Sequence, residues 1–238
     1  RRDFPAAGAA YEQALALAGK TGRSKLAAEL AAVLPLCAYE NAAAVDSTES
    51  PAAAAPLYLA VATRWPAYEH ASLALYRAGL GFAAAGEHDQ AVAAWERIVA
   101  ADANGAYGRD AAVRIAQSLE AAGHAASASL AWARFSELYP DGEDAPAALL
   151  KAIDLREVAA DTAGAESLRD DYLKRFPNDT ETAFAVAGSR ARRELDQAAR
   201  EGTPVATLVT RPVAKKKAAA VPVSAVRRYL DLAEAHPE

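Results

Sequence analysis

Apolar residues recur along this chain at intervals of three and four residues, with polar residues between them. Residues 90–99 show the pattern clearly, since Ala91, Trp95 and Ile98 fall on one face of a helix and the charged residues on another. Glycines and prolines interrupt the pattern at regular points, and these residues are typical of helix ends and turns. The sequence therefore predicts a series of amphipathic helices joined by short turns.

The pattern divides the chain into helices of similar length. The predicted helices cover residues 5–18, 24–45, 51–65, 68–85, 88–101, 109–122, 125–139, 145–160, 162–176 and 179–200. A stretch rich in Thr, Pro and Val follows over 201–222, and the helical pattern resumes in 223–238. We expect helical repeats over 1–200, an insertion over 201–222 that forms a flexible surface loop or a strap for a partner, and the second helix of a further repeat over 223–238.

The helices recur in pairs at a step of 37 residues. Pro140 and Pro177 are 37 residues apart, and Pro66 precedes Pro140 by twice that distance. Residues of matching chemistry align at the same step. The aligned columns are Tyr58, Trp95 and Trp132; Val61, Ile98, Phe135 and Tyr172; and Ala54, Ala91, Ala128 and Ala165. Several columns at one period indicate internal repeats, which decide the fold class before any single motif does.

One repeat is clearest, and its spacing of large, small and aromatic residues is informative. The residues that carry it are Leu75, Gly79, Phe82, Ala91 and Trp95. They resemble the tetratricopeptide repeat, and the resemblance implies an all-α protein whose helix pairs stack into a right-handed α-solenoid. Small residues at Gly79 and Ala91 are expected to let paired helices approach closely. Trp95 and Trp132 are expected to fill the space between one hairpin and the next.

Three extra residues per repeat distinguish this chain from the usual period of about 34. They fall between the closing proline and the next helix, as in residues 139–149, where Pro146 lies just inside a helix start. This turn is similar to that of the bacterial envelope branch of the family, which includes the lipoprotein of the outer-membrane barrel-assembly machine and the periplasmic coordinator of the Tol-Pal system. The resemblance implies a periplasmic or cell-envelope location, with the cytoplasm as the alternative. The first residues match the second helix of a repeat, so we expect a fragment of a larger bacterial protein.

Composition narrows the classes of function. More than a quarter of the residues are alanine, the strongest helix former, and the formal net charge is -5. Acidic and basic residues are interspersed, whereas nucleic-acid binding typically needs a basic stripe; Arg190, Arg192 and Arg193 are interpreted as a solvated helix face. The apolar runs are far shorter than the roughly 20 residues of a membrane span. A single cysteine excludes a disulfide framework.

No constellation for catalysis or metal binding stands out. His70, His88, His124 and His236 fall in different repeats, and Cys37 has no neighbouring histidine or basic pair to activate its thiol. The sequence also lacks a glycine-rich phosphate loop and the GxSxG and HExxH motifs. We therefore expect no catalytic residue, no metal and no cofactor.

In the family that this chain resembles, one face of each first helix lines a concave surface. Stepping by one period along that face gives a column of cations and a column of mixed polarity, with two tyrosines that add aromatic surface. The candidate partner-binding residues are Tyr39, Tyr76, Arg77, Leu80, Arg114, Gln117, Lys151 and Asp154. Such cations suit an acidic or C-terminal-carboxylate peptide. The alternative is salt bridges within the chain, with Glu40, Glu120, Asp154 and Glu157 as partners.

These patterns predict a non-catalytic scaffold for protein–protein interaction that holds a peptide or a partner helix in the concave groove. The envelope resemblance implies a role in assembling an outer-membrane, trans-envelope, pilus, secretion or motility complex. Two alternatives stay open. In the first alternative, the repeats form the helical accessory domain of a larger enzyme. In the second, they belong to a cytoplasmic regulator that senses a peptide.

Overall fold

The computed structural model describes residues 4–209 and 224–235, and every regular element among them is a helix. The all-α prediction is confirmed. The chain divides into two compact units, Arg1–Asp141 and Gly142–Glu238, and each is described by itself. Within the described ranges, no helix has the length and apolar character needed to cross a membrane.

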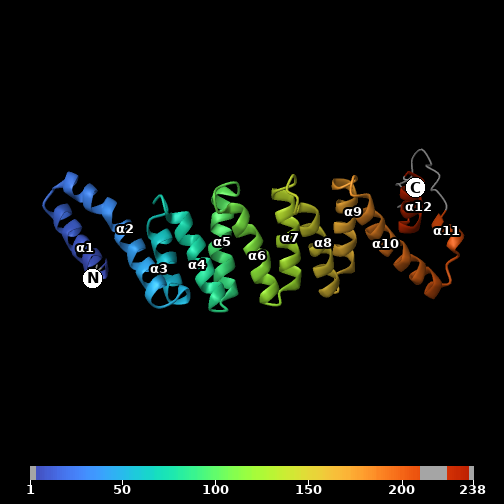
Figure 1. Ribbon diagram of the computed structural model, residues 1–238, viewed down its shortest axis with the longest axis horizontal. Helices are drawn as coiled ribbons and strands as arrows, with labels where there is room; N and C mark the ends of the chain where they lie inside the picture. The colour runs from blue at the N-terminus through green and yellow to red at the C-terminus, as the bar shows by residue number, and fades with distance from the viewer. Residues whose placement is uncertain (1–3, 210–223, 236–238) are drawn as a thin grey trace. The chain divides into compact units, whose positions relative to one another are not determined.

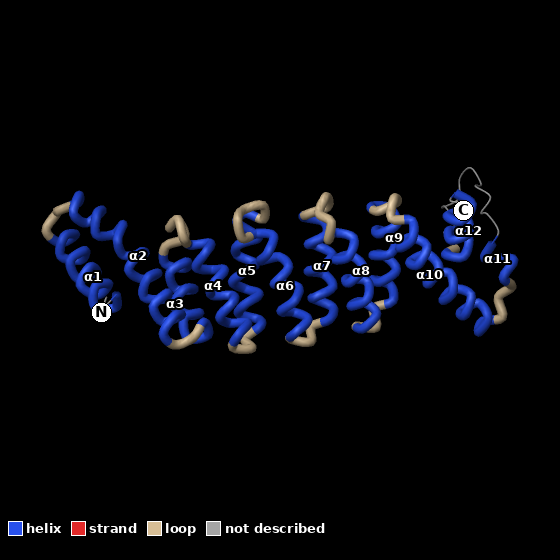
Figure 2. The backbone as a smooth tube through the Cα atoms, in the orientation of Figure 1, coloured by secondary structure: helices blue, strands red, loops and turns tan. Residues whose placement is uncertain are grey.

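The described part of the first unit consists of helices that each pack against the next one in the chain (Figure 1). They are α1 (Phe4–Lys20), α2 (Ser24–Thr48), α3 (Pro51–Arg64), α4 (Ala71–Ala84), α5 (His88–Asp102), α6 (Gly108–Ala121) and α7 (Ala125–Leu138). Short turns join them, as Figure 2 shows. After α4 and α6 the chain turns at Gly86 (φ 77°) and Gly123 (φ 76°), a left-handed conformation that glycine adopts without a steric cost. The bounds of α3 to α7 lie within three residues of those predicted.

Two helices of the second unit, α9 and α10, are capped by acidic side chains. Its described helices are α8 (Ala145–Val158), α9 (Thr162–Arg175), α10 (Thr180–Glu201), α11 (Val205–Val209) and α12 (Ala225–Ala235). Asp161 accepts a hydrogen bond from the Gly164 backbone N–H at 2.8 Å, and Asp179 accepts one from the Thr182 N–H at 3.2 Å. These bonds satisfy N–H groups that lack a partner within the helix, which fixes where α9 and α10 begin.

The predicted insertion over 201–222 is described only in part. It contains the short helix α11, which the apolar pattern did not predict, and residues 210–222 lie outside the described residues. The expectation of a loop or strap stays a prediction there. Beyond the insertion, α12 packs against α10, as expected for the second helix of a pair.

Two kinds of contact hold α12 on α10. The Tyr229 ring lies against Gly188, where an added Cβ would be 3.3 Å from the ring, and it meets the Phe184 ring edge-on at 6.0 Å. The Val226 backbone N–H donates a hydrogen bond to the Glu194 carboxylate at 2.8 Å. A glycine facing a tyrosine thus lets the last described helix approach closely.

Alanine forms most of the helix interfaces. Among the buried apolar residues of the described chain, alanines outnumber all others together, and several of them, such as Ala54, Ala78, Ala91 and Ala116, are completely buried. The axes of packed helices lie about 8–10 Å apart, depending on the side chains at the contact. Because alanine carries a single methyl group, helices that meet at alanines can lie closer together than helices that meet at larger side chains. The few large buried residues, with Trp95 and Tyr172 among them, then fill what space remains between the helices.

Trp95 shows how a small residue and a large one fit together. Its side chain is 1 % exposed, its indole lies against Gly79, and its Nε1–H donates to the Tyr76 carbonyl at 3.2 Å. The expected close approach at Gly79 is confirmed. These contacts lie within the α4–α5 hairpin, and the bond from Trp132 to Glu120 at 2.6 Å lies within the α6–α7 hairpin. The expectation that these indoles also fill the space between successive hairpins stays a prediction.

The Gly79→Ala variant is expected to lower the free energy of unfolding by about 1–3 kcal/mol. A Cβ at this position would lie 2.3 Å from the indole atoms of Trp95, which is buried and has no room to move. Glycine-to-alanine changes inside helices ordinarily stabilise by about 1 kcal/mol, so the sign is reversed here. Urea denaturation followed by circular dichroism measures the change.

Gly8→Ala is the matched control, because Gly8 lies within α1 and an added Cβ there meets no atom within 4 Å. This variant is expected to gain about 0.5–1 kcal/mol. A gain of similar size at Gly79 would contradict the tight contact with Trp95.

Ion pairs connect the helices of the second unit. Arg169, only 4 % exposed on α9, bonds to Glu157 on α8 and to Glu166 at 2.9 Å, and Arg193 on α10 bonds to Glu157 at 2.6 Å. The same network continues through further pairs. These are Arg190 with Glu166 and Asp170, and Arg228 with Asp170. Arg190 and Arg193 are therefore engaged in ion pairs, and of the three arginines interpreted as a solvated face only Arg192 is exposed.

Candidate functional site

Tyrosine and arginine side chains gather in the first unit, on helices α2, α3, α4 and α6 and on the turns between the helices. We call the group the tyrosine–arginine cluster. It consists of Tyr39, Tyr58, Tyr68, Tyr76, Arg77, Tyr107 and Arg114. The cluster contains five of the nine tyrosines of the chain. It is therefore a local concentration of aromatic and cationic groups, the side chains most enriched where proteins bind partners.

Arg77 lies at the centre of one half of the cluster. Its Nη1 donates to the Tyr58 hydroxyl at 2.8 Å, and its guanidinium lies 5.7 Å from the ring centroid of Tyr39 and 5.6 Å from that of Tyr58. The Tyr58 hydroxyl donates in turn to Asp46 at 3.2 Å. Arg77 itself forms no ion pair within the described residues. A half-buried cation is thus held by hydroxyl and ring contacts, with no carboxylate directly on it.

Burial sets the protonation of this half of the cluster. Burial raises the pKa of Tyr58, and the hydrogen bond from Arg77 opposes that effect only in part. Burial also raises the pKa of Tyr39, and there the charge of Arg77 acts in the opposite direction. Both hydroxyls are therefore neutral at physiological pH, and the positive charge of Arg77 stays uncompensated by a neighbouring phenolate.

Arg114 is held differently. Its Nε donates to Asp110 at 2.6 Å and to the Tyr76 hydroxyl at 3.0 Å, and Tyr76 donates to the same carboxylate. Burial acts to raise the pKa of Asp110, but the hydrogen bonds from Tyr76 and Arg114 outweigh it and hold that pKa below its usual value. Asp110 is therefore ionised and Arg114 is already paired. Tyr107 stacks on Tyr76 at 5.2 Å and completes this half of the cluster.

The structure brings together some of the predicted partner-binding residues. Tyr76, Arg77 and Arg114 lie in the cluster, Leu80 on α4 is half-buried, and Gln117 on α6 is exposed. Tyr39 is only 7 % exposed, so the expectation that it adds aromatic surface is wrong. The reason is that Tyr58 and His70 pack against its ring, each with centroids 5.5 Å away.

The remaining two predicted residues, Lys151 and Asp154, are exposed on α8 in the second unit. The structure therefore brings together two cations of the predicted column, Arg77 and Arg114, and the third cation lies in the other unit. Desolvation by nearby protein atoms and the charge of Glu157 raise the pKa of Asp154, although its side chain stays accessible to water.

Two of the cations can be compared with the internal salt bridges that the sequence suggested as the alternative. Arg77 bonds to Tyr58 and forms no ion pair with another described residue, whereas Arg114 forms a salt bridge with Asp110, which was not among the suggested acids. Glu120 accepts a hydrogen bond from Trp132. Glu157 pairs with Arg169 and Arg193. Within the described ranges, Glu40 and Asp154 form no ion pair. Glu157 thus pairs with arginines outside the predicted column of cations.

Sequence reasoning missed the partners that hold the arginines. Tyr58 was recognised only as an aligned core column, although it provides the hydroxyl on Arg77, and Tyr107 lies in a turn outside the repeat pattern. Asp110 was detectable in principle, because it precedes Arg114 by four residues and such pairs face each other on a helix.

The described residues contain no group of three or more His, Cys, Asp or Glu side chains placed to hold a metal ion. His70 packs on Tyr39 and Tyr68, whereas His124 lies 3.8 Å from Asp89 at another turn. Cys37 is buried, as expected for a small apolar residue, and His236 lies outside the described residues.

No protein-family model matches this chain, and no curated protein shows significant sequence similarity to it. Function is therefore inferred from the geometry of the tyrosine–arginine cluster and from the repeat pattern.

Proposed function

We infer that this protein is a non-catalytic scaffold for protein–protein interaction, built as a right-handed α-solenoid of tetratricopeptide-like repeats. The 37-residue period, the helix pairs at the predicted positions and the packing of each described helix on its neighbours within a unit support this proposal. In such an array the first helix of each pair lines a concave groove. α2, α4 and α6 are those helices, and they supply most of the tyrosine–arginine cluster.

The observation that carries the proposal is the state of Arg77. A half-buried guanidinium with no carboxylate partner in the described residues offers charge-assisted hydrogen bonds to an acidic side chain or a C-terminal carboxylate of a bound peptide. The surrounding tyrosine rings provide contact area and hold Arg77 in place before the partner arrives. Because the site is already ordered, little conformational entropy is lost on binding.

The long proline-containing turn of the repeats supports a setting in the bacterial cell envelope, where such a scaffold would help to assemble an outer-membrane, trans-envelope, secretion or motility complex. The residues 1–200 form the repeat array in this proposal, and residues 223–238 close it. A periplasmic location goes with this role.

Crosslinking in cells of the source organism tests the proposal. The intact protein and its Arg77→Gln variant are crosslinked, purified by affinity and compared by quantitative mass spectrometry. We expect outer-membrane or trans-envelope proteins with the wild type and roughly tenfold less of them with the variant, because a loss of about 1.4 kcal/mol in binding corresponds to that factor.

Arg192→Gln is the matched control, since Arg192 is exposed on α10 and belongs to no described ion pair. Circular dichroism verifies that both variants are folded. Equal recovery of partners by Arg77→Gln and wild type would place the interface outside the cluster. Recovery of a soluble enzyme as the main partner would contradict the envelope scaffold in favour of an accessory domain.

A further inference from the structure

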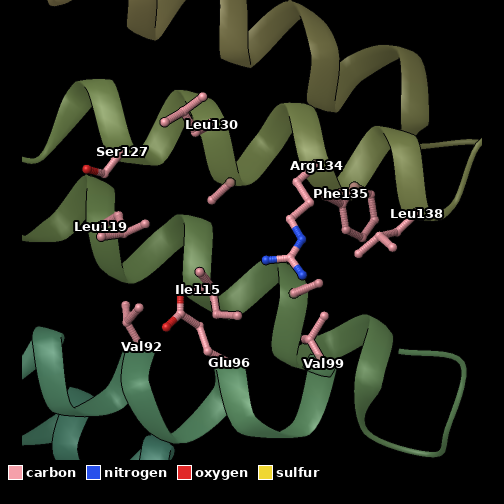
Figure 3. A pocket seen from close by; sticks show the side chains of 12 residues that line it. Val92, Glu96, Val99, Ile115, Leu119, Ser127, Leu130, Arg134, Phe135 and Leu138 are labelled. Atoms are coloured by element: carbon pink, nitrogen blue, oxygen red, sulfur yellow. The ribbon is translucent and has the colours of Figure 1, made fainter. Parts of the chain in front are cut away.

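A hollow lies in the first unit, lined by residues that do not belong to the tyrosine–arginine cluster. Helices α5 and α7 form its two walls and α6 its floor, and Figure 3 shows the side chains that line it. We call it the α5–α7 groove. Its lining includes Val92, Glu96, Val99, Ile115, Leu119, Leu130, Arg134 and Leu138. The volume is about 320 Å³, roughly twice that of a cavity that admits benzene, so two large apolar side chains fit.

The groove is apolar but carries one charge on each wall. Arg134 extends from α7 over the floor, and Glu96 presents its carboxylate from α5 (Figure 3). Neither side chain forms an ion pair or a hydrogen bond with another described residue. Covering either charge without a partner would cost free energy, because each would lose water and gain nothing in return.

Leu130 marks the mouth of the groove. This side chain is 59 % exposed on α7 and lines the groove together with buried residues such as Phe135 and Val99. An apolar surface that leads into a hollow of this size is the feature that anchors a partner side chain, whereas scattered exposed leucines are ordinary.

The direction of the groove decides the shape of the occupant. It follows α5 from Val92 to Val99 and α7 from Ser127 to Leu138, which is about two to three helical turns. An extended peptide lying on such an apolar floor would leave its backbone N–H and C=O groups without partners. A helix satisfies these groups itself and presents side chains one turn apart toward the floor.

We propose that the α5–α7 groove is a second docking site, which binds an amphipathic helix of a partner protein. Two aliphatic side chains one turn apart enter the groove beside Leu130. An acidic residue on one flank of that apolar stripe pairs with Arg134, and a basic residue on the other flank pairs with Glu96. The scaffold then holds two partners through separate sites, one on the tyrosine–arginine cluster and one here.

A peptide of defined composition tests this site on the full chain. The probe has about 16 residues, long enough for an isolated helix to form, with two leucines four residues apart, glutamate on one flank and lysine on the other. Isothermal titration calorimetry is expected to show micromolar binding to the wild type. We expect roughly tenfold weaker binding when the leucines become serine and when both flanks become glutamine.

Protein variants identify the residues involved. Leu130→Asp is expected to weaken binding of the probe by at least about tenfold, whereas Leu17→Asp, at a leucine that is 62 % exposed on α1, leaves it unchanged. Both residues are exposed, so neither change should prevent folding. Arg134→Glu makes both walls acidic, and this variant is expected to prefer a peptide with lysine on both flanks.

Several results would overturn the inference. Equal binding of the glutamine-flanked peptide would show that the charges take no part, and unchanged binding to Leu130→Asp would place the peptide elsewhere. If the wild type sediments as a dimer and Leu130→Asp as a monomer, the groove binds a second copy of this chain. Because the test does not touch Arg77, its failure leaves the proposed role of the tyrosine–arginine cluster intact.

Discussion

Replacing Trp95 with alanine is expected to lower the free energy of unfolding of the first unit by about 3–5 kcal/mol. The side chain is 1 % exposed and is among the largest fully buried side chains of the described residues. Its removal leaves a cavity next to Gly79, which has no side chain to fill it. The carbonyl of Tyr76 also loses its bond from the indole N–H. Urea denaturation followed by circular dichroism measures the effect.

Trp65→Ala is the control for this variant. Trp65 is half-buried at the end of α3, where Arg64 lies over its ring at 4.6 Å, so a clearly smaller loss is expected. Equal losses from the two substitutions would contradict the view that the α4–α5 hairpin depends on the fit between Trp95 and Gly79.

In the second unit, Arg169→Ala is expected to cost about 2–3 kcal/mol. Arg169 is almost completely buried, and its loss removes charge-assisted hydrogen bonds to Glu157 and Glu166. Breaking a fully buried pair costs about 3–5 kcal/mol. The cost expected for Arg169→Ala is lower because the side chains of Glu157 and Glu166 are 43 % and 30 % exposed, and water compensates part of the loss.

The cost of Arg169→Ala should depend on pH. Burial acts to raise the pKa of Glu157, but hydrogen bonds from Arg193 and Arg169 outweigh it and hold the pKa below its usual value. A carboxyl with a lowered pKa stabilises the fold above its unfolded pKa of about 4.3. That stabilisation is lost as the pH falls through the lower folded pKa. The difference in free energy of unfolding between wild type and variant is therefore largest near neutral pH and shrinks below about pH 4.

Arg192→Ala serves as the control, because Arg192 is exposed on the neighbouring helix α10. It is expected to change the free energy of unfolding by less than about 0.5 kcal/mol at any pH. A pH-independent loss in Arg169→Ala would mean that Arg169 acts by packing of its aliphatic stem, and the ion pairs would then have no measurable role.

The helices were predictable because their signals are local. The apolar period and the turn residues predicted α5 and α7 to within one residue at each end, and both follow an aligned repeat. α2 was predicted to end at residue 45 but continues through Asp46 and Ser47 to Thr48. The short α11 has no amphipathic period to detect.

The side-chain partners were harder to predict because they depend on how each helix is rotated about its axis. Arg77 meets Tyr58, which lies on the preceding helix α3, and no spacing within α4 could reveal that. The bond from Arg114 to Asp110 is different, because both residues lie on one helix at a spacing of four. Local pairs are thus visible in the sequence, whereas pairs between helices need the three-dimensional packing.

The same limit applies to burial. Tyr39 and Tyr76 occupy equivalent places in the repeat, and the sequence treated both as exposed aromatic surface. The structure buries Tyr39 because Tyr58 and His70 pack on it, whereas Tyr76 is half-buried and stacks on Tyr107. The neighbours that pack on each ring decide this difference, and they come from other helices and turns.

The alanine-lined helix interfaces have a consequence for how stability changes with temperature. The heat capacity change on unfolding grows with the apolar area that becomes exposed, and a methyl group exposes much less than a leucine or phenylalanine side chain. A core in which alanines predominate should therefore have a smaller heat capacity change per residue than an average domain. The curve of stability against temperature is then flatter, so that the protein keeps a similar, modest stability over a wide range of temperatures and loses less of it in the cold.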